Sequence, residues 1–276
     1  RYTEALTELN TVIGSGAYSI DPSYRRLFGA DNHLSDEIIF AIPQDGIRMK
    51  NYGGSTFLVH ANIGGPLNAA DFGVNFAWWG LRMRPETRGL FPSIGAGAVD
   101  GRAAFWANMD TPTITDMFTY TQGTAAPKWT NKTAGGANGS DLEHADTDVV
   151  MFRLGDAYLM YAELAARGTA GASLATALTY MNTLRQRAYG NTSGNYAGTG
   201  AITLDEVLNE RARELYMEGH RRQDLIRVGQ FTGGARIWTF KGGTSAGAST
   251  QAFRDLYPLP ASELIANPKL TQNPGY

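Results

Sequence analysis

The sequence predicts a mainly α protein, in which tetratricopeptide-like helical hairpins are joined to a loop-rich region with short strands. Two observations lead to this fold class. Apolar residues recur at helical spacing near the N-terminus and again along a stretch that begins at Thr147. Between them, from Asp21 to about Asp146, no long helical pattern persists, and glycine and asparagine are frequent. We therefore expect a rigid helical part beside a part built from loops.

The first segment, YTEALTELNTVIG, predicts an amphipathic helix that two glycines then end. Its apolar stripe includes Leu6, Leu9 and Ile13 and needs a partner helix, yet nothing precedes it. We interpret residues 1–20 as the last helix of an incomplete N-terminal helical-repeat region, and expect that an upstream part is missing from the sequence.

Residues 21–146 are predicted to form a loop-rich, ligand-side region. DEIIFAI, residues 36–42, is typical of a buried strand bounded by turn residues, and RPETRGL, residues 84–90, favours a short helix. Loops of such length in a compact domain are usually functional or disordered. Interleaved aromatic rings between residues 52 and 79 favour order here.

Residues 147–232 are predicted to form a helical-repeat hairpin and a further helix. VVMFRLGDAYLMYAELAARG reads as one long helix with Thr147 or Asp148 as its N-cap. SLATALTYMNTLRQRAYG follows as its antiparallel partner, and the pair matches a tetratricopeptide unit of roughly 34 residues. The second helix should turn these side chains inward: Leu174, Ala177, Leu178, Met181 and Leu184.

The third helix begins at ITLDEV, where Thr203 and Glu206 predict a capping box and Ile202 with Val207 a hydrophobic staple. Gly219 is expected to bend or end this helix. Residues 233–276 contain too many prolines for a long helix and are predicted to form an extended C-terminal wrap.

Composition excludes several classes of protein. The net charge of −2 gives no basic excess for a polyanion, so no nucleic-acid partner is expected. Cysteine is absent, which excludes disulfides and cysteine-ligated metals. No apolar run reaches the roughly 18 residues that suggest a bilayer-spanning helix.

Three glutamates in NERARELYMEGHRRQDLIRVG, namely Glu210, Glu214 and Glu218, are four residues apart and stack along one helical face. One interpretation is the acid and nucleophile of a retaining glycosidase, roughly 5–5.5 Å apart. The other is structural ion pairing, with further partners in Arg185 and Arg187. We favour the second, because neighbouring guanidinium groups lower the pKa of a carboxyl group. A carboxyl group that stays ionised is a poor proton donor. The predicted network comprises Glu210, Arg211, Glu214, Glu218, Arg221, Asp224 and Arg227, with pairs such as Glu210–Arg213, Asp224–Arg227 and Glu218 with Arg221 or Arg222.

The stretch around NFAWWG is the candidate ligand site. Pyranose rings stack their C–H faces on aromatic rings, while amide and charged side chains bond the hydroxyls. Adjacent side chains of an extended segment point to opposite faces, so at most one of the two tryptophans should meet a ligand. The alternative is that the rings only pack the loop region. The predicted contacts are Asn51, Tyr52, His60, Asn62, Asn75, Phe76, Trp78 and Trp79.

No cofactor or catalytic residue is expected. The histidines are scattered, and neither a phosphate loop nor a nucleophile elbow occurs. One acidic group offers the hard oxygen ligands that calcium prefers but lacks EF-hand spacing, so a solvated loop with a helix cap is favoured and calcium stays the alternative. The group is Asp141, Glu143, Asp146 and Asp148.

Six stretches, in order, then carry a family resemblance. They are TVIGSGAYSI, DEIIFAI, WWGLRMRPETRGLF followed by DGR, VVMFRLGDAYLMYAELAARG, LNERARELYMEGHRRQDLIRVG and YPLPASELIANPKLTQNPGY. Together they resemble the C-terminal part of the SusD/RagB family of outer-membrane nutrient-binding lipoproteins, over nearly the whole chain.

The resemblance implies a binding protein on the extracellular face of the outer membrane. It would capture oligosaccharides, or peptides in some members, and deliver them to a SusC-like, TonB-dependent transporter. Membrane attachment would come only through a lipid anchor on the missing N-terminal part. Two alternatives stay open: a glycan-active enzyme with paired carboxylates, and a structural subunit of the transporter complex that binds no ligand.

Overall fold

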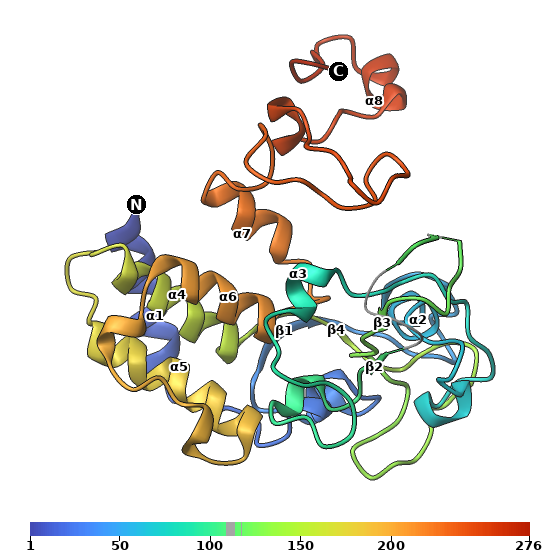
Figure 1. The fold of residues 1–276 in the computed structure, drawn as a ribbon, viewed down its shortest axis with the longest axis horizontal. Coiled ribbons are helices and arrows are strands. Elements are labelled where there is room, and N and C mark those ends of the chain that lie inside the picture. Colours follow the sequence, from blue (N-terminus) through green and yellow to red (C-terminus); the bar gives the residue numbers. More distant parts are fainter. Residues whose placement is uncertain (109–113, 117) are drawn as a thin grey trace. The chain divides into compact units, whose positions relative to one another are not determined.

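The structure is a computed structural model that describes residues 1–108, 114–116 and 118–276 (Figure 1). The chain divides into two compact units, residues 1–218 and 219–276. The helices of the first unit are α1 (Tyr2–Gly14), α2 (Gly54–His60), α3 (Pro85–Arg88), α4 (Leu154–Ala166), α5 (Leu174–Tyr189) and α6 (Leu204–Glu214). Its strands are β1 (Ile38–Ile42), β2 (Ala107–Asn108), β3 (Thr124–Ala125) and β4 (Val149–Arg153). The second unit contains α7 (Arg221–Arg227) and α8 (Ala261–Ala266).

Helices α1, α4, α5 and α6 lie together on one side of the first unit (Figure 1). Helix α4 contacts the other three, and their apolar faces form one core around Leu159, Met181 and Val207. Ser173 caps α5 by accepting a hydrogen bond from the Thr176 N–H, and Gly190 ends α5 in the left-handed conformation. The mainly α fold class with a hairpin of α4 and α5 is confirmed.

The long helix predicted from Thr147 is wrong in its first part. Residues 149–153 form β4, which pairs antiparallel with β1, and α4 begins only at Leu154. The run VVMF is apolar at every position, and such a run is compatible with either a strand or a helix. The predicted strand β1 is present but half exposed rather than buried, with Phe40 opposite Phe152 in the register. Leu174 is also 40 % exposed rather than turned inward.

The loop-rich half of the first unit has a core of its own. Its buried side chains are mostly aromatic, including Phe28, Phe91, Trp106 and Trp129. Of the rings between residues 52 and 79 only Phe72 belongs to this core, and Tyr52, Phe57, Phe76 and Trp79 are exposed. No helix within the described residues is long and apolar enough to cross a membrane.

Helix α6 begins as predicted, since the Thr203 hydroxyl accepts a hydrogen bond from the Glu206 N–H. It ends at Glu214, earlier than Gly219, and Met217 then takes a positive φ of 59°. The predicted C-terminal wrap contains α8 and lies in the second unit, which begins at Gly219.

Candidate ligand-binding site

Two backbone segments build the candidate site. The chain leaves α2 at Ala61, and residues 78–81 run alongside it. The N–H groups of Trp78, Trp79 and Leu81 donate to the carbonyls of His60 (2.9 Å), Ile63 (3.2 Å) and Ala61 (3.0 Å) respectively. These three bonds hold the two tryptophans at fixed positions.

Trp78 lies in a cluster of rings on one side of this segment. It stacks on His60, with ring centroids 4.8 Å apart and planes at 18°. Tyr52, Phe57 and Phe76 surround it at 5.9–6.2 Å, and all three are exposed. We call these five side chains the Trp78 cluster.

His60 lies inside the Trp78 cluster and is fully buried. Its Nδ1 lies 2.7 Å from the Phe76 carbonyl oxygen and its Nε2 lies 3.0 Å from that of Glu143. Burial lowers the pKa of the ring, against the two hydrogen bonds, which raise it. The structure therefore places this predicted contact residue where it joins two loops rather than on the surface.

Trp79 belongs to a different ring pair from Trp78, and its backbone is left-handed rather than extended as the sequence prediction assumed. Its φ is 63°, in the left-handed region that costs a non-glycine residue about 1–3 kcal/mol. The indole lies directly against Gly64, where a Cβ atom would be 2.5 Å from Cγ and Cδ1 of Trp79. It stays 37 % exposed, and its neighbour is the edge of Tyr120, 6.4 Å away at 75°.

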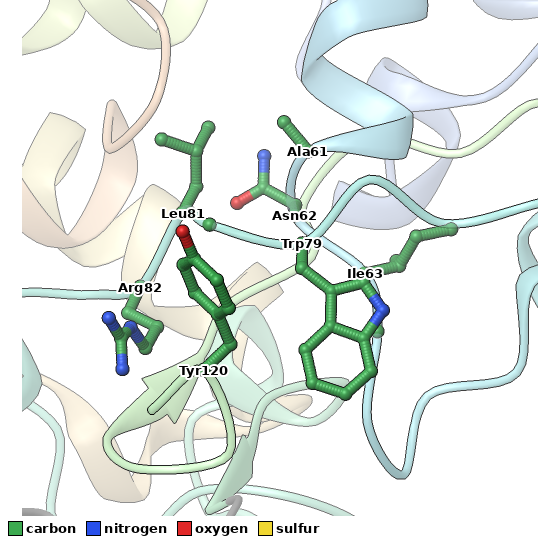
Figure 2. Close-up of a pocket in the computed structure, with 9 residues that line it drawn as sticks. Ala61, Asn62, Ile63, Trp79, Leu81, Arg82 and Tyr120 are labelled. Atoms are coloured by element: carbon green, nitrogen blue, oxygen red, sulfur yellow. The ribbon is translucent and has the colours of Figure 1, made fainter. Parts of the chain in front are cut away.

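Figure 2 shows the shallow pocket beside Trp79. It measures about 200 Å³ including space open to solvent. Arg82 stands at one side, its guanidinium over the Tyr120 ring and its Nη1 donating to the carbonyls of Thr119 (2.9 Å) and Gln122 (2.7 Å). The lining residues are Ala61, Asn62, Ile63, Gly64, Trp79, Gly80, Leu81, Arg82 and Tyr120.

The predicted contact residues are thus divided between two faces. Tyr52, Phe76 and Trp78 belong to the Trp78 cluster, whereas Asn62 and Trp79 line the pocket. The two remaining predicted contacts are exposed. Asn51 shapes a turn, accepting from the Gly53 N–H and donating to the Met49 carbonyl, and Asn75 binds the Leu142 carbonyl through its backbone N–H.

Sequence reasoning missed Gly64, Arg82 and Tyr120 in the pocket. No periodicity or motif connects Tyr120 with Trp79, because their approach depends on long-range folding. The positive φ of Trp79 also has no signal in the sequence.

The acidic group after residue 140 is engaged in local hydrogen bonds. Asp141 accepts from the backbone of Glu143 and His144, Asp146 accepts from Gly46, and Asp148 accepts from Gln44. The last of these carboxylates precedes a strand, so it does not cap a helix. Across residues 1–108, 114–116 and 118–276, no three His, Asp or Glu side chains gather in a way that could hold a metal ion.

The glutamate stripe lies in a buried charge network that joins the helices of the first unit to its loop-rich half. Glu214 accepts from Arg102 (3.0 Å), Arg153 (2.7 Å) and Arg187. The members, all nearly inaccessible to solvent, are Glu37, Asp100, Arg102, Lys128, Arg153, Arg187, Glu210, Glu214 and Glu218.

Glu210 pairs with Arg213 at 2.6 Å, as expected, and also with Arg102 and Arg185. Burial alone would raise its pKa, but these guanidinium groups outweigh burial and lower the pKa to about 2. The pKa of Glu214 is lowered in the same way. Carboxyl groups held ionised this firmly do not donate protons near neutral pH.

The partners predicted for Glu218 are wrong. It pairs with Arg153 at 2.8 Å and with Lys128, because α6 ends before it and the chain turns at Met217. In the second unit, the expected pair of Asp224 with Arg227 is present at 2.8 Å. Arg211 pairs with Asp156 at 2.7 Å.

The sequence of this chain is similar to proteins of one family. A family model described as the SusD family matches residues 99–276. Over the whole chain, the sequence is 32 % identical to the starch-binding protein SusD of Bacteroides thetaiotaomicron. The chain belongs to the SusD family. It spans 56 % of the length of that SusD relative.

Solved structures share the fold of this SusD-family chain. Surface glycan-binding protein A from Bacteroides fluxus is similar with a TM-score of 0.71 and 21 % identity, over 100 % of this chain and 58 % of that one. The corresponding protein from Bacteroides thetaiotaomicron in complex with laminarihexaose has a TM-score of 0.64 and 21 % identity, over 99 % and 59 % of the two chains. The SusD-like fold class is therefore confirmed.

Proposed function

We propose that this chain is part of a cell-surface protein that captures oligosaccharides and delivers them to a SusC-like, TonB-dependent transporter. The protein would be lipid-anchored on the extracellular face of the outer membrane and would bind its ligand without cleaving it. The named relatives support binding of a glycan, since one is a starch-binding protein and another is a glycan-binding protein in complex with laminarihexaose.

The single observation that carries the proposal is the presentation of Trp79. An exposed indole is held in a strained backbone conformation, with the backbone of Gly64 supporting one of its faces. Strained residues persist only where the surroundings over-determine them, and they concentrate at ligand-binding positions. A supported indole beside Asn62, Arg82 and Tyr120 offers a stacking surface with polar groups at its edge, which suits a sugar ring.

The glycosidase alternative has less support. Its candidate carboxylates Glu210 and Glu214 have no accessible surface and are each shared by three arginines. A buried, ionised carboxylate reaches neither a glycosidic oxygen nor a water molecule.

Calorimetry on the purified protein tests the proposal, with maltohexaose and laminarihexaose as probes. We expect binding to at least one of them and at least about a tenfold loss of affinity in Trp79→Ala, equivalent to roughly 1.4 kcal/mol. Phe40→Ala is the matched control, because Phe40 is an aromatic residue that is 56 % exposed on β1 and is not part of the pocket. Equal losses in the two variants, or hydrolysis of the probe, would contradict the proposal.

A further inference from the structure

Asn62 is the polar side chain at the floor of the pocket. It follows α2, is only 2 % exposed, and donates from Nδ2 to the Leu58 carbonyl at 2.7 Å. This bond distinguishes the two ends of the amide, because only the nitrogen can donate to a carbonyl. The carbonyl end, Oδ1, is buried and has no hydrogen-bond partner among the described residues.

A buried acceptor without a partner is uncommon in native proteins. The amide of Asn62 belongs to a lining residue, and Figure 2 shows its oxygen on the side of the Tyr120 hydroxyl. Leaving such a group unpaired is unfavourable, and a ligand that donates a hydrogen bond to it would recover that loss. The pocket therefore has a specific place for a donor.

We propose that Asn62 determines specificity, accepting through Oδ1 a hydrogen bond from one ring hydroxyl of the sugar that stacks on Trp79. The inference rests on the proposed function and names the chemistry at one position of the ligand. A hydroxyl fits there, a deoxy position leaves the oxygen unpaired, and a carboxylate is disfavoured because both groups only accept.

The oxygen has almost no accessible surface in the free protein, so a neighbouring side chain has to move when the hydroxyl arrives. Tyr120 is one lining residue of the pocket and is 43 % exposed.

A thermodynamic cycle that combines protein variants with deoxy analogues of the ligand, measured by calorimetry, tests this inference. Monodeoxy analogues of whichever probe binds, maltohexaose or laminarihexaose, are titrated into the parent, Asn62→Leu and Asn10→Ala. The parent should bind one analogue about tenfold more weakly than the intact probe, and Asn62→Leu should bind both equally. Asn10→Ala, at an exposed position of α1, should discriminate as the parent does.

Asn62→Asp is a second variant in case Asn62→Leu does not fold. When protonated, its carboxyl donates to the Leu58 carbonyl and keeps a carbonyl oxygen towards the pocket. An accepting oxygen therefore remains towards the pocket, and Asn62→Asp should bind the deoxy analogue more weakly than the intact probe; equal binding of the two by this variant would overturn the inference.

The outcomes separate the two proposals. If the parent binds neither probe, the proposed function fails and this inference fails with it. If the parent binds and Trp79→Ala weakens binding, but Asn62→Leu still discriminates against the same analogue, glycan binding stands and the role of Asn62 is overturned. Equal binding of every deoxy analogue by the parent overturns it as well.

Discussion

The buried charge network and the Trp79 pocket lie in the same unit and differ in exposure and in how their side chains are paired. In the network, Glu214 alone is shared by Arg102, Arg153 and Arg187. In the pocket, Trp79 is strained and Asn62 Oδ1 is unpaired within the described residues. The turn at Met217 in the network also has a positive φ, so it is exposure together with strain, rather than strain alone, that distinguishes Trp79. We therefore expect the first region to contribute stability and, on the proposed function, the second to contact the ligand.

The comparison also shows that residue type alone misleads. Glutamates spaced four apart resemble the carboxyl pair of a glycosidase, and the tryptophans resemble ordinary core packing. Burial and pairing contradict both resemblances. The glutamates are inaccessible to solvent, whereas Trp79 contacts Gly64 and is 37 % exposed.

The largest effect is expected from Glu214→Ala. The substitution leaves three buried guanidinium groups without a shared counter-charge, so the free energy of unfolding should fall by about 3–5 kcal/mol. Glycan affinity per folded molecule should stay that of the parent. Chemical denaturation and calorimetry measure the two quantities.

Glu206→Ala is the matched control on the same helix, because the Glu206 side chain pairs with Arg213 at 2.9 Å but is 27 % exposed. It should cost less than about 1 kcal/mol. Suppose that Glu214→Ala had the same denaturation midpoint as the parent but no longer bound the glycan. The assignment of stability to the network and of binding to the pocket would then be wrong.

The second-largest effect is expected from acid, which should lower the free energy of unfolding by protonating the glutamates of the network. The folded-state pKa of Glu210 is lowered from 4.5 to about 2, so its contribution is present above pH 4.5 and is lost as the pH falls towards 2. A difference of about 2.5 in pKa corresponds to roughly 3 kcal/mol. Glu214 and Glu218, whose pKa values are also lowered, act in the same direction.

Denaturant melts between pH 7 and pH 2 measure this loss. Glu210→Gln should be less stable than the parent at pH 7 and should lose less stability on acidification, since its amide does not titrate. Identical slopes for the two proteins would show that Glu210 does not carry the acid sensitivity.

Helices α1 and α6 were predictable because each has a local signal, the apolar stripe of α1 and the Thr203 cap of α6, whereas the short helices α2 and α8 were not predicted. Strand β4 was not, because its partner β1 lies far upstream and the apolar run around Val150 fits either structure. Pairing is a long-range property that periodicity does not contain.

Part of the candidate site could be predicted in the same way. The sequence placed both tryptophans among aromatic rings, and both do lie in ring contacts, but the left-handed backbone of Trp79 replaces the extended alternation that was expected. The rest of the site depends on contacts between loops. Gly64 contacts the Trp79 indole, Tyr120 lines the pocket, and His60 is buried. None of these follows from spacing.

The smallest change in stability, and the most direct test of the pocket, is expected from Gly64→Ala. Gly64 has a φ of 149°, and its added Cβ would lie 2.5 Å from the Trp79 ring, so the indole has to leave its position. We expect about 1–2 kcal/mol of destabilisation and about a tenfold loss of glycan affinity.

Gly97→Ala is the control for the backbone effect alone. Gly97 also has a positive φ, 88°, but a Cβ atom there would meet nothing within 4 Å. It should cost a comparable free energy of unfolding and leave glycan affinity at the parent's value. If both variants kept full affinity, the contact of Gly64 with Trp79 would serve packing alone, and the proposed difference between a buried network for stability and an exposed pocket for binding would be wrong.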